Sequence, residues 1–536
     1  MAEIDTRSTT GSVSDGQDNP QGLPRHISTF TAITFALACV GLATSGTLPY
    51  SSFLGIWPGA NLVVVLIIGV VLSLIHGYTF SMMGVIAPRS GADYVVASRV
   101  LSAPVGFAAS WGTMLVGVLL AGTALAFLSD SLLPSLLRNI GMVVGSTGML
   151  AVAESVEKPE TIVLVGAVVA VIIYGATILP PKVMEIINKI GLFGGLAAWG
   201  AILVQLAVPV VAFSTGWDRF LGSQNYAERF VRATNLGMEI QPAENWLVYG
   251  GLLIGFSLFF GNWISTYYAG EVKNPERTLL ASSWTSTLVA GGIFIAAAAL
   301  LQRLAPLNWL AAESFLYQSD GFEGLTMPWI YFYANAVSPS LIASVLVFFG
   351  FSLLIINLVQ MQFLYTSRIL VAWADDGMLP SIVGMIHPSL KSPILAVLIV
   401  ACVSLLSLLA SGLMGAANNP IEYILLLAVF QLPPALAIAV LPFTRPSWFA
   451  AAPKIARLKI GPIPLVTVTG LVSFIYLLAV CVLPFVVPMG KGVGQLAVFL
   501  VIGIVLSGVA WYFLFSRHQI KSGVQVDEHF RSLTRQ

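Results

Sequence analysis

Two clusters of small and hydroxylated residues interrupt apolar stretches of the chain. The first is GLATSGTLPY at 41–50, and the second is GGLLIGFSLFFGNW at 250–263. A helix that unwinds in an apolar environment leaves backbone groups without partners, so such breaks are tolerated where they line a cavity or are packed in protein. The freed amides can hold anionic groups and the freed carbonyls can hold cations. We therefore expect a small-molecule site at the two breaks, although glycine and serine also simply allow helices to pack closely.

His76 is the titratable side chain that lies deep in an apolar stretch. Histidine changes its charge near neutral pH, which makes His76 a candidate for proton coupling. The alternative is a neutral histidine that is hydrogen-bonded to a neighbouring helix. The three cysteines have no metal-ligand spacing and suggest no disulfide framework, so the sequence predicts neither a metal site nor a cofactor.

The composition identifies the environment in which these residues must work. Charged residues make up 9% of the 536 residues, where a soluble domain carries about 25%, and hydrophobic residues make up 57%. This balance excludes a soluble enzyme and a disordered protein. A net charge of +1 gives no footprint for nucleic acid. The sequence predicts a membrane protein that crosses the lipid bilayer many times.

Twelve apolar runs have the length of a membrane-spanning helix, which is about 20 residues. They are continuously apolar, whereas barrel strands would alternate between apolar and polar residues. The third and eighth runs are longer than one span needs. The predicted spans are 30–56, 60–86, 100–128, 161–180, 186–214, 245–269, 281–302, 332–373, 392–413, 420–442, 463–486 and 494–515.

The distribution of basic residues predicts the orientation of the spans. If the N-terminus is cytoplasmic, eighteen of the 25 Lys and Arg residues fall on the inner side and seven on the outer side. Both termini are then cytoplasmic. Residues 1–26 are polar and show no signal-peptide pattern before the first span, so we expect a disordered cytoplasmic tail. Residues 516–536 form a second short polar tail, which is expected to be cytoplasmic. We expect the plasma (inner) membrane as the location.

Three loop motifs carry a resemblance to a known family. They are APRSGADYVVASRV at 87–100, GEVKNPERT at 270–278 and TSRILVAWADDGMLP at 366–380. Each is similar to a motif of the amino acid–polyamine–organocation (APC) permeases, at the corresponding span. Physically, these motifs read as loop-folding and topology signals, with Asn274-Pro275 as a turn and Gly377 as a helix stop.

The resemblance implies a fold. It is an all-α polytopic membrane protein with 12 transmembrane helices, arranged as a five-plus-five inverted repeat (a leucine-transporter-like fold) and two further C-terminal helices. The first repeat would cover 27–214, an extracytoplasmic loop 215–244, the second repeat 245–442 and the last two helices 443–515.

The resemblance also assigns a substrate site. In the first span Ser45 and Gly46 match the family's I-G-S-G-I-F-type break, while Thr44 replaces a glycine; in the sixth span Trp263 replaces a glutamate. Aromatic residues near the breaks could contact an amine by cation–π interaction, or could pack in the core or against lipid. The implied substrate-binding residues are Thr44, Ser45, Gly46, Thr47, Phe256, Ser257, Phe259, Phe260 and Gly261, together with Trp111 of the third span.

These features predict a secondary active transporter, either a symporter or an antiporter, that works by alternating access. No acidic residue lies at mid-depth in a span, which favours a neutral or zwitterionic amino acid over a cationic one. The coupling partner stays open between H+, Na+ and a counter-substrate. Gly194 lies where some proton-coupled relatives have a lysine, and Asn357 lies where sodium-dependent relatives have hydroxyl residues.

Other functions were weighed against this one. The alternatives are a nutrient sensor with a transporter fold, or a permease for another amine or organic cation. A facilitator built from two six-helix halves would need a long connection between spans 6 and 7, and the connection here is short. An intramembrane enzyme would need paired aspartates, an activated nucleophile or H-E-x-x-H within the spans, and we expect no enzyme.

Overall fold

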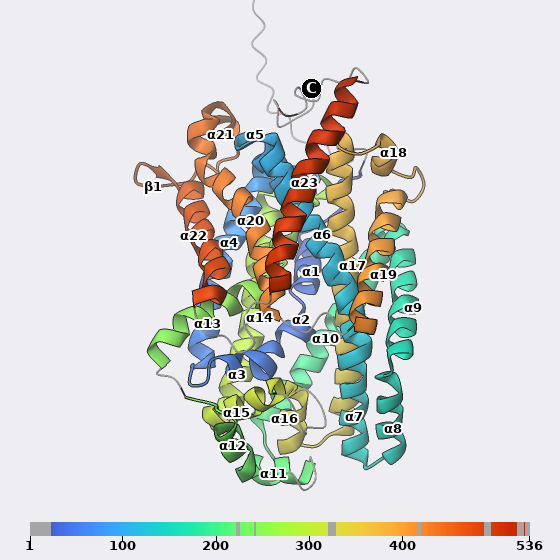
Figure 1. The fold of residues 1–536 in the computed structure, drawn as a ribbon, viewed down its shortest axis with the longest axis vertical. Helices are drawn as coiled ribbons and strands as arrows, with labels where there is room; N and C mark the ends of the chain where they lie inside the picture. The colour runs from blue at the N-terminus through green and yellow to red at the C-terminus, as the bar shows by residue number, and fades with distance from the viewer. Residues whose placement is uncertain are drawn as a thin grey trace, which may run out of the picture.

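The computed structural model describes residues 23–220, 226–240, 243–319, 328–414, 420–486, 495–521 and 530. Most of each predicted tail, at 1–26 and 516–536, lies outside these residues, as do parts of the 215–244 loop. The described chain is almost entirely helical, and its long helices run roughly along one axis (Figure 1). The prediction of an all-α polytopic protein is confirmed.

Ten helices of the described chain are long and apolar enough to cross a membrane, and a bent pair in the first span would make eleven. The prediction of exactly twelve spans is therefore not confirmed. The ten are α4 (Leu62–Ile86), α6 (Ala103–Phe127) continued through η2 (Leu128–Leu132) into α7 (Leu133–Val144), α9 (Pro159–Ile178), α10 (Pro181–Ala207), α14 (Pro275–Leu304), α17 (Leu341–Asp375), α19 (Ile394–Met414), α20 (Pro420–Thr444), α22 (Leu465–Val486) and α23 (Gln495–Lys521).

The first and sixth spans are interrupted. The first consists of α1 (Thr29–Cys39), α2 (Leu42–Ser45), the π-turn η1 (Pro49–Phe53) and α3 (Leu54–Ile56), with a bend of 48° between α1 and the part that follows. The sixth is helical in α13 (Ala243–Leu258) and then continues as turns, with only the 3-10 turns η3 (Ile264–Thr266) and η4 (Ala269–Glu271). The predicted sixth run of 245–269 is thus a helix over its first part only.

Shorter elements cap the two ends of the bundle (Figure 1). One end, called the α5 end below, carries α5 (Ala92–Val100), α18 (Ser381–Gly384), α21 (Pro446–Ala451) and the antiparallel strands β1 (Lys459–Ile460) and β2 (Ile463–Pro464). The other, the α15 end, carries α8 (Thr147–Val156), α11 (Phe213–Phe220), α12 (Tyr226–Asn235), α15 (Leu307–Gln318) and α16 (Ile330–Val337). The long eighth run of 332–373 is interrupted near Ser338, where α16 ends and α17 has yet to begin.

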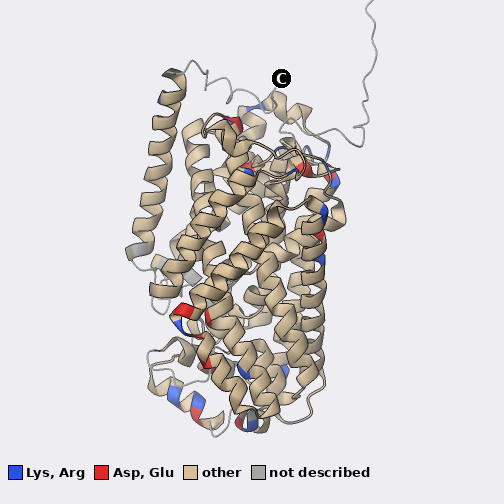
Figure 2. Cartoon of the chain, turned by 90° about the vertical axis from the view of Figure 1, so that its right-hand side faces the viewer, with Lys and Arg blue, Asp and Glu red and all other residues tan. Residues whose placement is uncertain are grey.

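The surface of the bundle has the polarity of a membrane protein. Most charged residues gather toward the two ends, while the middle of the bundle is nearly free of them (Figure 2). Large apolar side chains on the outside of the helices are exposed, among them Leu164, Ile342 and Phe349. In a soluble protein a surface of this kind would associate or aggregate, so lipid is its natural solvent.

Small residues let α10 and α17 pack closely. The backbone of Gly350 on α17 approaches the carbonyl of Gly194 on α10, so that any side chain at Gly350 would collide with it. The Asn357 Nδ2 atom donates a hydrogen bond of 2.8 Å to the Asn188 carbonyl oxygen. Gly194 and Asn357 therefore lie in the contact between these two helices.

Buried ion pairs join the three loop motifs at the α5 end. Arg99 makes two hydrogen bonds of 2.8 Å to Asp376, which links α5 to the residue after α17. Arg368 on α17 donates bonds of 2.7 and 3.0 Å to Glu271 in η4. Two-bond Arg–carboxylate pairs fix geometry as well as charge. The motifs thus hold the α5 end together.

We predict that Asp376→Ala strongly destabilises the protein, because it leaves the buried Arg99 guanidinium without its carboxylate. Loss of one partner of a buried ion pair costs about 3–5 kcal/mol. The matched control is Glu157→Ala, since the Glu157–Arg138 pair is part-exposed and such pairs contribute less than about 1 kcal/mol. Thermal unfolding in detergent compares the two variants. Equal melting temperatures would contradict this role of the Arg99–Asp376 pair.

Candidate functional site

The break of the first span falls within the predicted stretch 41–50. Gly41 has a φ of 67°, a left-handed conformation that favours glycine, and α2 starts directly after it. The predicted hydroxyl residues bond to carbonyls of the break itself. Ser45 Oγ donates to the Val40 oxygen at 2.8 Å, Thr44 Oγ1 to the Gly41 oxygen at 3.1 Å and Thr47 Oγ1 to the Ala43 oxygen at 3.0 Å. The Gly41 oxygen also accepts the backbone N–H of Ser45 at 2.8 Å, so the hydroxyl bonds add to the backbone bonds of the break.

Trp199 on α10 closes one side of this break. Its indole Nε1 donates a hydrogen bond of 3.2 Å to the Leu42 carbonyl oxygen. The ring lies so close to Gly46 that a side chain there would collide with it. Phe294 and Phe351 hold the indole, with ring centroids 5.8 and 5.6 Å away. This contact could not be predicted from the sequence, because a buried tryptophan needs an acceptor for its N–H, but its residue type does not identify that acceptor.

The break of the sixth span begins where α13 ends, at Leu258. Gly261 has a φ of 89°, and its backbone packs against Cys39, the last residue of α1. The side-chain amide of Asn262 anchors this segment by donating to the Ser73 oxygen at 3.1 Å and to Thr287 Oγ1 at 2.8 Å. Ser73 Oγ in turn donates to the Gly255 oxygen at 2.6 Å. The two breaks are therefore in direct contact through Cys39 and Gly261.

The other residues predicted for the sixth span lie around this contact. Phe259 is buried, and its ring centroid is 6.1 Å from that of Phe294. Phe260 is half-buried and meets the edge of Trp263 at 5.3 Å. Ser257 Oγ is buried and has no hydrogen-bond partner among the described residues. The side chain of Phe256 lies outside what the structure describes.

Trp111 is not brought to the breaks. Its indole stacks on Trp373 at 5.5 Å and on Trp511 at 5.3 Å, and its Nε1 donates to Ser507 Oγ at 3.1 Å. These contacts place Trp111 between α6, α17 and α23. None of these described contacts joins Trp111 to either break, and its role in the substrate site stays a prediction.

His76 lies beside the second break, enclosed by aromatic rings. Its ring centroid is 4.5 Å from that of Phe80, 4.4 Å from Trp263 and 6.2 Å from Tyr476. Trp263 lies directly after the second break, so His76, the candidate for proton coupling, contacts the sixth span at this break. The surroundings pack the imidazole on several sides.

A polar cluster that the sequence reasoning missed lies between the sixth-span break and α5. The Asp93 carboxylate accepts a hydrogen bond from the Tyr267 hydroxyl, and Gln431 Nε2 on α20 lies 3.4 Å from that hydroxyl oxygen. Burial raises the pKa of Asp93 to about 6, although the hydrogen bonds that it accepts oppose this rise. Asp93 belongs to the 87–100 motif, which was interpreted only as a topology signal.

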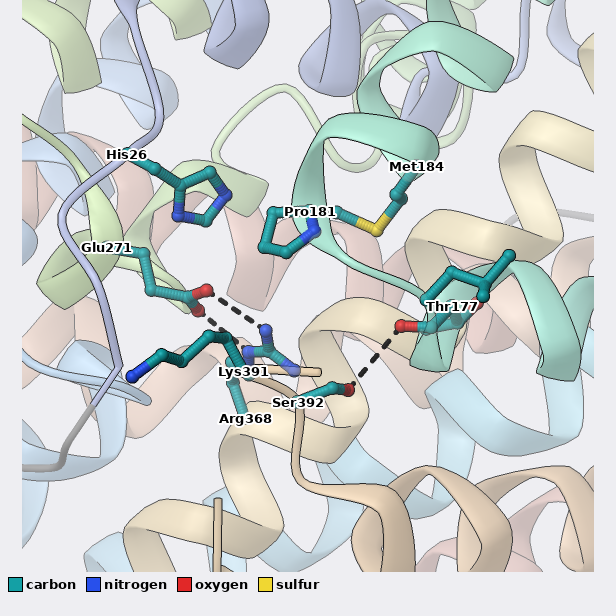
Figure 3. Close-up of a pocket in the computed structure, with 9 residues that line it drawn as sticks. His26, Thr177, Pro181, Met184, Glu271, Arg368, Lys391 and Ser392 are labelled. Carbon is teal, nitrogen blue, oxygen red and sulfur yellow. Dashed lines mark hydrogen bonds and ion pairs between the residues drawn. The ribbon is translucent and has the colours of Figure 1, made fainter. Parts of the chain in front are cut away.

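One cavity that the structure shows lies at the α5 end. Figure 3 shows the Glu271–Arg368 pair at one side of it, with His26 above and Lys391 in front. Ser392 and Thr177 are joined by a hydrogen bond on the other side. None of the predicted substrate-binding residues lines this pocket.

The α15 end covers the first span. Gly55 donates its backbone N–H to Ser314 Oγ at 2.9 Å, and Gln318 Nε2 donates to the Ser52 oxygen at 2.7 Å. Glu313 of the same helix pairs with Arg229 of α12 at 3.2 Å. Burial raises the pKa of Glu313 to about 7, and Arg229 opposes the rise only in part.

We predict that Gly261→Ala destabilises the protein, because a methyl group would have to enter the contact with Cys39 at a positive φ. Strain of this kind costs about 1–3 kcal/mol. The control is Gly292→Ala on α14, where an added Cβ meets no atom within 4 Å. Thermal unfolding of the purified variants in detergent measures both. An unchanged melting temperature for Gly261→Ala would show that the breaks do not pack as described.

One comparison with known proteins matches nearly the whole chain. The family model described as "Amino acid permease" matches residues 27–507. A search of curated proteins found no match. The matched range contains both broken spans and all three loop motifs. On this match, together with its apolar spans, the chain belongs to the amino acid permease family of the APC superfamily.

Proposed function

We propose that this permease is a secondary active transporter for neutral or zwitterionic amino acids, with the substrate held between the two breaks. The observation that carries the proposal is the contact of Gly261 with Cys39, which brings the interrupted parts of the first and sixth spans together. A break in each of two touching spans supplies free backbone amides and free backbone carbonyls at one place. An amino acid carries a carboxylate, which suits the free amides, and an ammonium group, which suits the free carbonyls.

The carboxylate would lie at the start of α2. The amides of a helix's first turn have no carbonyl of the same helix to pair with. The ammonium group would bind carbonyls of the breaks, several of which accept bonds from Ser45, Thr44 and Trp199 in the unliganded protein. Substrate then replaces existing donors, so that no buried carbonyl is left unsatisfied.

The preference for an uncharged side chain follows from where acids are buried. Three of the buried acidic residues, Glu271, Glu313 and Asp376, are engaged by arginines toward the ends of the bundle. A cationic side chain at the breaks would lack a neighbouring carboxylate in the described structure, and an unpaired buried charge is costly.

Alternating access would require the two closures to open in turn. The α5 end is closed by the Glu271–Arg368 pair and by the bridge between Ile27 and Val272. The α15 end is closed by α15 over the first span. We propose that the α5 end faces the cytoplasm in the plasma membrane, since basic residues favour that side. The proposed inverted repeat of 27–214 and 245–442 would make the closure of the α5 end and the closure of the α15 end corresponding parts of the two repeats.

We predict that purified protein in liposomes preloaded with unlabelled amino acids takes up labelled neutral amino acids by exchange. A panel of neutral, acidic and cationic amino acids and of amines identifies the substrate class. If nothing in the panel enters while the protein is folded and inserted, the amino acid assignment fails, and a sensor role or an unusual organic substrate replaces it.

We predict that Gly46→Ala lowers this exchange at least about tenfold, because the methyl group would meet the Trp199 ring and the Leu42 oxygen and so displace the first break. The matched control is Gly200→Ala on α10, where an added Cβ meets no atom within 4 Å. Equal exchange rates for the two folded variants would mean that substrate does not bind at this break.

A further inference from the structure

Asp93 differs from the other buried acidic side chains that the structure describes. Glu271, Glu313 and Asp376 each have an arginine within ion-pair distance, whereas no ion pair is found for Asp93. Its side chain is 1% exposed, and its Oδ1 atom has no hydrogen-bond partner in the described structure. A buried carboxylate without a basic partner is costly, so the environment favours the neutral acid.

Asp93 lies where the 87–100 motif docks on the segment that follows the sixth-span break. Asp93 lies in the first turn of α5, where backbone N–H groups of residues 93 and 94 donate to its carboxylate. The loop just before it docks on the segment that follows the sixth-span break. Gly91 donates its N–H to the Tyr267 oxygen at 2.9 Å, and Ser90 forms a backbone bridge with Tyr268. The Tyr267 hydroxyl then bonds to Asp93 from the same segment.

We propose that the Asp93 carboxyl binds the coupling proton of this transporter, taking it up while the α5 end is closed and releasing it when that end opens. This inference rests on the proposed function and names its coupling ion. The step is a protonation, in which the carboxylate and one proton form the carboxylic acid and no other bond changes.

Two titratable side chains act directly on the Asp93 carboxyl. Tyr267 donates a hydrogen bond to the carboxylate. Tyr365 on α17 lies near enough for the charge of Asp93 to act on its hydroxyl. The ring centroids of Tyr267 and Tyr365 are 5.0 Å apart. On α20 the facing group is the neutral amide of Gln431, which contacts Tyr267. The sequence of α6 contains no titratable side chain. The nearest candidates on α4 are engaged elsewhere, His76 among aromatic rings and Tyr78 with the Ile455 oxygen.

The charged residues of the surrounding elements have other partners. On α5 and α17 the basic groups Arg99 and Arg368 bind Asp376 and Glu271. Arg89, in the loop before α5, lies 4.0 Å from Asp375. Arg445, after α20, donates to the carbonyl oxygen of Arg99. The Asp93 carboxyl is thus left as the group whose charge is not neutralised by a partner.

Linkage gives the direction of the effect. While the 87–100 motif is docked on the segment after the sixth-span break, Asp93 is buried and its pKa is raised from 3.8 to about 6. Opening of this contact would hydrate the carboxyl and return its pKa toward the ordinary value. The closed form therefore binds the proton more tightly, and between these two pKa values its stability falls as pH rises. A shift of about two units corresponds to at most about a hundredfold change in the closed-to-open ratio. A proton enters with the substrate and leaves on opening.

A line of polar groups extends from Asp93 toward the interior. Tyr267 bonds to Asp93, Gln431 lies 3.4 Å from the Tyr267 hydroxyl, and Gln431 also lies 3.4 Å from Thr113 Oγ1 on α6. The same segment that carries Tyr267 begins at the sixth-span break. Movement of that segment on substrate binding would therefore change the surroundings of the Asp93 carboxyl.

The first experiment measures proton movement directly. Wild-type protein in liposomes is given a labelled neutral amino acid with and without an inward proton gradient, and a pH-sensitive dye inside reports proton entry. We expect the gradient to drive accumulation and the amino acid to drive acidification. Exchange without any response to the gradient overturns the proton proposal but leaves the amino acid function intact. If no amino acid exchanges, the proposed function itself fails.

Variants then test the residue. Asp93→Asn is expected to reduce the ratio of uptake with and without the gradient to one. Glu313→Gln is the matched control, because Glu313 is also buried with a raised pKa but lies at the α15 end; its ratio stays above one. A gradient response that persists in Asp93→Asn contradicts the proposal.

A second variant covers the case in which Asp93→Asn does not fold. Tyr267→Phe removes the hydroxyl that bonds to the carboxylate and holds its pKa down. The midpoint of the pH profile of uptake should then move to higher pH. An unchanged midpoint, or a shift to lower pH, would contradict the role of Asp93.

Discussion

The fold depends on one constraint, that every backbone N–H and C=O in the bilayer needs a partner. Most of the chain meets it with continuous helices. The first and sixth spans meet it differently. In the first span the hydroxyl of Ser45 and the indole of Trp199 donate to the carbonyl oxygens of Val40 and Leu42. Asn262 and Ser73 anchor the second break to its neighbours. Breaks that are stabilised in this way can exchange a side-chain donor for a substrate group.

The ends of the bundle are built on a different interaction. Arginine–carboxylate pairs such as Arg99–Asp376 and Arg368–Glu271 are excluded from water and join segments that are far apart in the sequence. Such pairs stabilise a closed end only while both partners stay in place. Among the buried acidic side chains that the structure describes, Asp93 has no arginine partner, so its charge is left to be set by protonation.

Apolar periodicity and loop motifs were sufficient to predict the helical membrane fold, the family and the positions of both breaks. Span number was less predictable, because α13 stops at Leu258 within the predicted sixth run, and α16 separates from α17 at residues 338–340 within the predicted eighth run. The packing of Trp111 against α23 could not be foreseen, because the face that a residue of α6 presents depends on contacts with distant helices. Asp93 and Trp199 were missed because burial of a loop aspartate, or the acceptor of an indole, is set by contacts between residues distant in the chain.

The central claim is that the two breaks form one substrate site. A structure determined with a bound neutral amino acid tests it most directly. The account predicts the substrate between the start of α2 and residues 259–262, with its carboxylate toward the α2 amides. Substrate found elsewhere, for example in the pocket lined by His26 and Lys391, with the contact of Cys39 and Gly261 unchanged, would contradict it.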